Sequence, residues 1–140
     1  MKLNKIFFNY LILIFILGFI FNYIWESLHY VLYICKVPLG KCSLITSLID
    51  ALIVILLYIG GVFVYLDSRW INSFNKNKVI SLSAASFLIA IIIEIQGVYL
   101  FNKWGYSELM PVVFGIGLSP LLQMIFIPLL IFYLVGKVKI

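Results

Sequence analysis

The stretch Asn22-Tyr-Ile-Trp-Glu-Ser-Leu-His29 closes the first long apolar run of the chain, and the rest of the sequence is interpreted around it. Asn22, Glu26 and His29 stand at positions i, i+4 and i+7, which puts them on one face of a helix. An ionisable group at membrane depth needs a partner or a water-filled cavity, because an isolated charge is costly there. The stretch therefore predicts a polar site within an apolar helical protein.

The composition is that of an integral membrane protein. The 140 residues are 65% hydrophobic and 11% charged, with a mean hydropathy of +1.20. A soluble domain carries about 25% charged residues. At about 20 residues for each membrane span, plus loops, the chain has room for four or five helices in one domain. We expect an all-α polytopic membrane bundle of four helices, at about 6–34, 44–66, 79–101 and 119–135, with a short interfacial or re-entrant segment.

The first helix is expected to remain uncleaved. Lys2 and Lys5 precede an apolar run, as in a signal peptide, but the run is too long and no small-residue cleavage site follows.

The apolar segment 109–118 is too short to span a membrane, and its glycines suit an interfacial or re-entrant piece. Ser119 and Pro120 then predict an N-cap followed by proline at the first helical position.

The cations predict the orientation. With four spans, seven cations share one side of the membrane and three the other, so both termini are expected in the cytoplasm and the protein in the cell membrane. The net charge of +5 is then explained by topology, and no nucleic-acid partner is expected. The first group is Lys2, Lys5, Arg69, Lys76, Lys78, Lys137 and Lys139; the second is Lys36, Lys41 and Lys103.

Polar residues converge on the outer level of this topology. Asp50 is near the outer end of the second helix, Glu94 in the outer half of the third, and Gln123 in the first turn of the fourth. Together with Glu26 and His29, they predict one site shared by several helices.

Three interpretations of Glu26 and His29 remain open. The i, i+3 spacing is used by metal-binding bundles, and Asp50 and Glu94 would complete a set of one histidine and three carboxylates. A metal-free acid/base or binding site is the favoured alternative, with no cofactor. The third is simple solvation of a helix end at the membrane interface.

The individual candidates differ in strength. Eleven of the fourteen residues from Ala84 to Gly97 are apolar or glycine, so the Glu94 carboxyl is expected to be protonated or paired. Asp50 could instead occupy an exposed helix N-terminus, and Gln123 could meet water. We expect Glu94, Glu26, His29 and Asp50 to be catalytic. The expected substrate-binding residues are Asn22, Trp25, Trp104, Tyr106 and Gln123.

Cys35 and Cys42 bracket a loop on the expected outer side, where disulfides persist. A structural disulfide is favoured over metal binding or a catalytic thiol.

The chain resembles a group of small prokaryotic four-helix membrane proteins of uncharacterised activity. The resemblance covers most of the chain but implies no reaction. A weaker likeness, to sterol-isomerase-like membrane proteins, carries no residues over because the order of the motifs differs. The first resemblance rests on Trp25-Glu26, Asp50, Glu94-x-x-Gly97, Trp104-Gly-Tyr106, Met110-Pro111 and Gly117-Leu-Ser-Pro-Leu-Leu-Gln123.

The leading hypothesis is a membrane-embedded enzyme or binding protein for a lipid, an isoprenoid or another small apolar ligand. Glu94 would donate a proton, Glu26 or Asp50 would accept it, and His29 would orient or share it. The alternatives are a small proton-coupled transporter acting as a homodimer and a non-catalytic accessory subunit of a membrane complex.

Overall fold

Four long helices form the framework of the protein. The structure is a computed structural model that describes residues 5–35 and 39–138. The helices are α1 (Lys5–His29), α2 (Leu39–Tyr65), α3 (Lys76–Glu94) and α4 (Leu118–Lys137). Each belongs to a segment that is long and apolar enough to cross a membrane. The expected all-α membrane bundle is therefore confirmed, and its architecture is that of a multi-pass membrane protein.

Short elements gather at one end of the bundle, which we call the strand end. Two pairs of short antiparallel strands lie there, and one pair joins segments that are distant in the sequence, with Tyr33 opposite Tyr106. The strands are β1 (Tyr33–Cys35), β2 (Trp104–Tyr106), β3 (Val112–Val113) and β4 (Ile116–Gly117). Single helical turns complete the elements: η1 (Tyr30–Leu32) and η2 (Trp70–Ser73) are 3₁₀ turns, and η3 (Ile95–Leu100) extends α3 as a π-helical turn.

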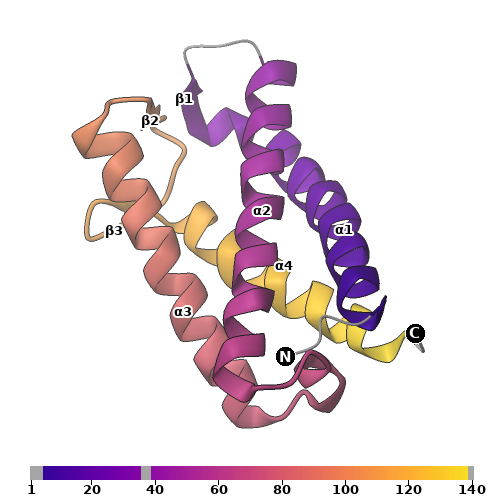
Figure 1. The fold of residues 1–140 in the computed structure, drawn as a ribbon. Coiled ribbons are helices and arrows are strands. Elements are labelled where there is room, and N and C mark those ends of the chain that lie inside the picture. The colour runs from indigo at the N-terminus through magenta and orange to yellow at the C-terminus, as the bar shows by residue number, and fades with distance from the viewer. Residues whose placement is uncertain (1–4, 36–38, 139–140) are drawn as a thin grey trace.

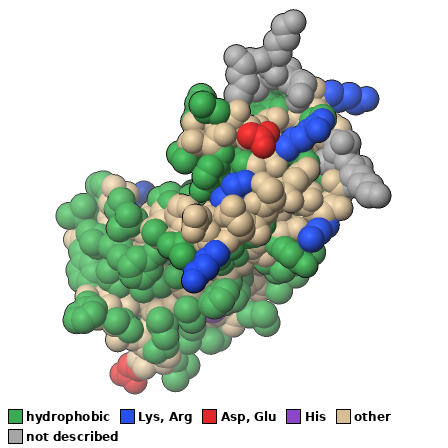
Figure 2. All heavy atoms as spheres, turned by 90° about the horizontal axis from the view of Figure 1, so that it is seen from below, with side chains coloured by type: hydrophobic (Ala, Val, Ile, Leu, Met, Phe, Trp, Pro, Cys, Tyr) green, Lys and Arg blue, Asp and Glu red, His purple; other side chains and the backbone are tan. Residues whose placement is uncertain are grey.

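The opposite end, here the terminus end, holds the start of α1, η2 and the end of α4 (Figure 1). Figure 2 looks at this end and shows Lys and Arg side chains over part of it, with hydrophobic side chains covering the flanks. Of the cations in the described residues, the terminus end carries Lys5, Arg69, Lys76, Lys78 and Lys137, and the strand end carries Lys41 and Lys103.

The helices α2 and α3 lie close together at the terminus end and diverge toward the strand end (Figure 1). The main contacts between helices are those of α1 with α2, of α3 with α4 and of α1 with α4. The divergence leaves room for polar side chains between α2 and α3 near the strands.

The apolar core is densest near the terminus end. The indole of Trp70 is 1% exposed and donates from Nε1 to the Tyr58 carbonyl at 3.1 Å. Gly61 makes this position possible, because a Cβ there would lie 2.4 Å from the Trp70 ring. The aromatic ring thus seals the end of the bundle opposite the polar residues.

Two helix ends differ from those expected. The first helix stops at His29, and the chain continues through η1 into β1 instead of remaining helical to residue 34. The second begins at Leu39, so Cys42 is helical. Asp50 consequently lies about three turns into α2, and the hypothesis of an exposed N-terminal position is wrong.

The segment before α4, expected as an interfacial or re-entrant piece, contains a β-hairpin formed by β3 and β4. Positive φ angles at Phe114 (50°) and Gly115 (83°) turn the chain between the strands. The helix α4 begins at Leu118, and no side chain caps it. The prediction that Ser119 is the N-cap is therefore wrong, because its hydroxyl group faces α1 instead.

Candidate functional site

The side-chain amide of Gln123 connects three helices. Its Nε2 atom lies 3.0 Å from each of three acceptors: Asn22 Oδ1, Glu26 Oε1 and Asp50 Oδ2. Asn22 is oriented for this contact because its own amide nitrogen donates to the Gly18 carbonyl at 2.8 Å. Asn22 and Glu26 lie four residues apart on one face of α1. This face therefore meets α2 and α4 at one point, the Gln123 amide.

This contact makes Glu26 and Asp50 near neighbours, since one nitrogen atom donates to a carboxyl oxygen of each. Gln123 is only 3% exposed, so bulk water does not compete for its hydrogen bonds to the two carboxyl groups. Two carboxylates that share a site repel each other when both are ionised. Such a pair is suited to holding a single proton between its members.

Glu94 has a separate set of partners, which β1 and β2 supply. Its carboxyl group is buried, at 4% exposure, and accepts from the Tyr106 hydroxyl at 2.6 Å. Tyr33 Oη and Trp104 Nε1 donate to it at 3.4 Å each. The strand pairing explains this arrangement, because it sets Tyr33 directly opposite Tyr106.

Gly97 provides the space that Trp104 needs beside Glu94. A Cβ at residue 97 would lie 1.9 Å from Cζ2 of the indole. Any larger residue would thus displace one of the three donors to Glu94.

The two tyrosines at this position remain protonated well beyond neutral pH. Burial raises the pKa of Tyr33, and the nearby Glu94 and Glu26 carboxyl groups raise it further. Burial also raises the pKa of Tyr106, together with its hydrogen bond to Glu94. Both phenols are therefore available as hydrogen-bond donors.

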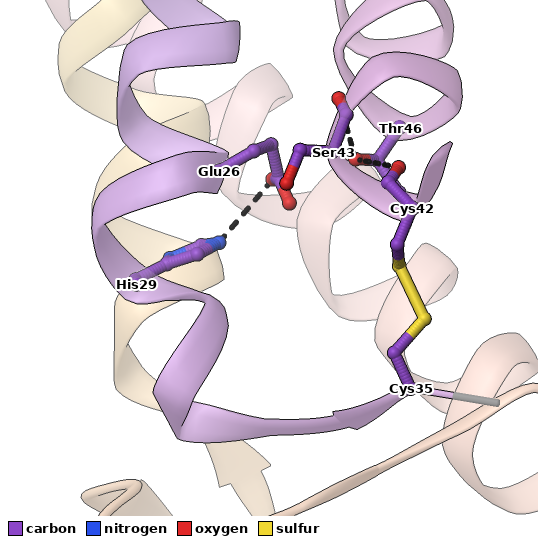
Figure 3. The surroundings of a disulfide bond; sticks show 6 residues. All are labelled: Glu26, His29, Cys35, Cys42, Ser43 and Thr46. Carbon is purple, nitrogen blue, oxygen red and sulfur yellow. Dashed lines mark hydrogen bonds and ion pairs between the residues drawn. A yellow bond between two sulfur atoms is a disulfide. The ribbon is translucent and has the colours of Figure 1, made fainter. Parts of the chain in front are cut away.

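His29 lies behind Glu26, between α1 and α4. Its Nε2 atom is 3.3 Å from Glu26 Oε1 (Figure 3). On the other side of the ring, Nδ1 is 2.5 Å from Ser119 Oγ, which also accepts from Trp25 Nε1 at 3.3 Å. Trp25, His29 and Ser119 together join α1 to the start of α4.

A cavity of about 140 Å³ lies between the helices at the strand end. A cavity of about this size, lined by apolar side chains, accepts a ring such as benzene. The lining residues are Glu26, Tyr30, Tyr33, Cys35, Cys42, Thr46, Ile49, Asp50, Ala90, Ile93, Glu94, Trp104, Pro120, Gln123 and Met124.

Several of the residues singled out in the sequence meet at this cavity. Glu26, Asp50, Glu94, Trp104 and Gln123 line it. Four others support the lining residues from behind: Asn22 contacts Gln123, Tyr106 contacts Glu94, His29 contacts Glu26, and Trp25 acts through Ser119.

Sequence reasoning missed two contributors, Tyr33 and Ser119. Tyr33 follows His29 by four residues, and this spacing was the available signal, since their ring centroids lie 5.2 Å apart. The proline after Ser119 favoured a capping role for the serine, which concealed its contact with His29.

The cysteines are joined by a disulfide. Cys35 of β1 bonds to Cys42 of α2, and both residues border the cavity (Figure 3). The bond ties the strand that carries Tyr33 to the helix that carries Asp50.

A metal centre is not assembled in the described parts of the chain, where no three His, Cys, Asp or Glu side chains are placed to hold an ion. The donors around Glu94 are aromatic hydroxyl and indole groups. The metal interpretation of Glu26 and His29 stays a prediction.

Comparison of the chain with protein families, with curated proteins and with solved structures finds no significant match. The resemblance noted from the sequence stays a prediction, and the function has to be argued from the geometry of the site.

Proposed function

We propose that the protein is a membrane-embedded site for acid/base chemistry on a lipid or isoprenoid substrate. The observation that carries this proposal is the single amide of Gln123, which contacts the carboxyl groups of both Glu26 and Asp50 beside an apolar cavity. A carboxyl pair that shares a proton and a third carboxyl group on α3 supply a donor and an acceptor at one cavity.

The surroundings of the carboxyl groups favour particular roles. Glu94 accepts hydrogen bonds from three donors, which suits a proton acceptor, although the sequence alone suggested a donor. The Glu26–Asp50 pair is the better proton donor, because like charges at one amide favour retention of one proton.

The proposed substrate class is supported by the residues at which the cavity meets the surface. Cavity-lining residues of α2 and α3 include Ile49, which is 52% exposed, and the half-buried Ile93. In a membrane-spanning helix, this exposed apolar surface faces lipid chains. A substrate would therefore enter sideways from the bilayer, with only a reactive group of about benzene size inside and its tail left among the lipids.

The orientation proposed for the protein puts both termini in the cytoplasm of a cell and the strand end outside. Support comes from the described cations, which number five at the terminus end and two at the strand end. A disulfide at the strand end agrees with an oxidising compartment on that side.

Proton transfer at carbon leaves a measurable trace in heavy water. Membranes containing the protein, incubated in D₂O, are expected to accumulate carbon-bound deuterium in one apolar lipid class, detected by mass spectrometry of the extract. Asp50→Asn should lower the incorporation by roughly 100-fold, the lower range of what a positioned acid or base contributes. The matched control is Leu88→Ala, because Leu88 lies on α3 and is 60% exposed.

Equal labelling in membranes with and without the protein would contradict an enzymatic role. A lipid that copurifies with the wild type but not with Asp50→Asn, and stays unlabelled, would indicate binding alone. Proton uptake by proteoliposomes without any lipid requirement would favour the proton-coupled transporter.

A further inference from the structure

The only histidine in the chain occupies a position that the proposed chemistry does not by itself explain. His29 is 7% exposed and does not line the cavity. One ring nitrogen contacts Ser119 and the other faces Glu26, which does line the cavity. The imidazole therefore stands between a half-buried hydroxyl group and a carboxyl group of the site.

The neighbouring donors favour one tautomer of the ring. Trp25 Nε1 donates its proton to Ser119 Oγ at 3.3 Å. The hydroxyl proton of Ser119 is then free to point at His29 Nδ1, 2.5 Å away. With Nδ1 as an acceptor, the ring proton of a neutral histidine must reside on Nε2, which faces Glu26 Oε1 at 3.3 Å.

On α1 and α2, two buried polar atoms lack a hydrogen-bond partner among the described residues. They are His29 Nε2 and Ser43 Oγ, and Ser43 is 2% exposed. Figure 3 shows both side chains directed toward the Glu26 carboxyl group from different helices. Unpartnered buried polar atoms reduce stability and are rare, so both atoms retain hydrogen-bonding capacity that the described side chains do not use.

We propose that Ser119 and His29 form a proton relay that recharges Glu26 between reaction cycles. This inference rests on the proposed function, since it supplies the proton that the Glu26–Asp50 pair donates. In the relay step, the Nε2–H bond breaks as the proton passes to the Glu26 carboxylate, and Nδ1 takes the proton of the Ser119 hydroxyl group. Ser119 regains a proton from a water molecule, which leaves as hydroxide, so charge and atoms balance. The ring, left with its proton on Nδ1, returns to the Nε2 tautomer by exchanging that proton with water before the next cycle.

Each residue has a defined part in the relay. His29 and Ser119 act through Glu26 and are positioning residues, while Trp25 directs the Ser119 proton toward the ring. The ionisable groups that face the imidazole are Glu26 on its own helix and Tyr33 on β1.

Nuclear magnetic resonance of the protein labelled with ¹⁵N-histidine, in lipid nanodiscs, tests the relay without a substrate. A single histidine gives one set of ring signals. We expect the wild type to carry its proton on Nε2 and to exchange it with water. Ser119→Ala should slow this exchange by roughly 100-fold, whereas Ser119→Thr, which keeps the hydroxyl group, should restore it.

The control is Ser86→Ala, which removes another buried hydroxyl group without a partner in the described chain, on α3. Thermal unfolding identifies any variant that has lost its fold, and Ser119→Thr then decides the result. A proton on Nδ1, or equal exchange in folded wild type and Ser119→Ala, would overturn the relay. Full lipid deuteration in Ser119→Ala would also overturn it and leave the proposed function standing, whereas a working relay without lipid deuteration would sink the proposed function alone.

Discussion

At the scale of single residues, substitutions of Glu94 test whether its carboxyl group has a function or is only tolerated. Glu94→Gln keeps an acceptor for Tyr106 and Trp104, so we expect the free energy of unfolding to change by about 1 kcal/mol or less. Lipid deuteration should nevertheless fall by roughly 100-fold, because an amide does not titrate. Thermal unfolding in nanodiscs and the D₂O assay measure the two effects.

Glu94→Leu provides the matching test of stability. It leaves the Tyr106 hydroxyl and the Trp104 indole without an acceptor, at a cost of about 1–3 kcal/mol for each donor that remains buried. If Glu94→Leu were as stable as the wild type and deuterated lipid at the same rate, Glu94 would be a tolerated acid without a role.

Helix periodicity predicted one half of the site and missed the other. The faces of α1 and the depth of Asp50 and Gln123 were sufficient to predict that Glu26, Asp50 and Gln123 meet. The same reasoning placed Glu94 in one site with these groups, and it does line the same cavity, although its hydrogen bonds go to three aromatic residues that the sequence did not predict as its partners. Those partners come from the β1–β2 pairing of sequence-distant segments, which no local pattern encodes.

At the scale of elements, the disulfide holds the strand end together. Cys35 and Cys42 join β1 to α2, and β1 pairs with β2, which carries Trp104 and Tyr106. We expect both thiols to resist alkylation in membranes until a reductant is added. Closing this short loop should contribute about 2 kcal/mol, and the double variant Cys35→Ser/Cys42→Ser should lose lipid deuteration because β1 and β2 no longer fix the donors to Glu94.

Two outcomes would contradict a structural role for the disulfide. Alkylation of both cysteines in unreduced membranes would show that the thiols are free. Unchanged stability and deuteration in the double variant would mean that the β1–β2 pairing holds without the bond.

The long helices were predictable because apolar runs of this length have few alternative structures in a membrane. The ends of these helices were harder to predict. A continued apolar and aromatic sequence after His29 looks helical, yet the chain forms η1 and β1, where pairing with β2 replaces helical hydrogen bonds. The segment Leu109–Leu118 likewise folds as a hairpin because it can satisfy its backbone groups locally.

At the scale of the whole molecule, polar and apolar interiors occupy opposite ends. The terminus end is closed by Trp70 and its aromatic neighbours, whereas the strand end contains the carboxyl groups and the cavity. In the proposed function, a substrate reaches this cavity from the bilayer past Ile49 of α2 and Ile93 of α3. This division supports the proposed chemistry on a membrane-resident molecule over the alternative of a proton-coupled transporter.

The sidedness of the membrane decides which compartment the site and the disulfide face. Reporter fusions after residues 40, 72, 110 and 140 should be read outside, inside, outside and inside, because cations accumulate on the cytoplasmic side. Replacing Arg69, Lys76 and Lys78 together with glutamine should weaken this bias and yield a mixed orientation, whereas replacing Lys41 and Lys103 should not. The inverse alternation in the unmodified chain would contradict the proposed orientation. It would put the Cys35–Cys42 bond in the reducing compartment and make lipid of the inner leaflet the substrate. The geometry of the carboxyl groups would remain as described.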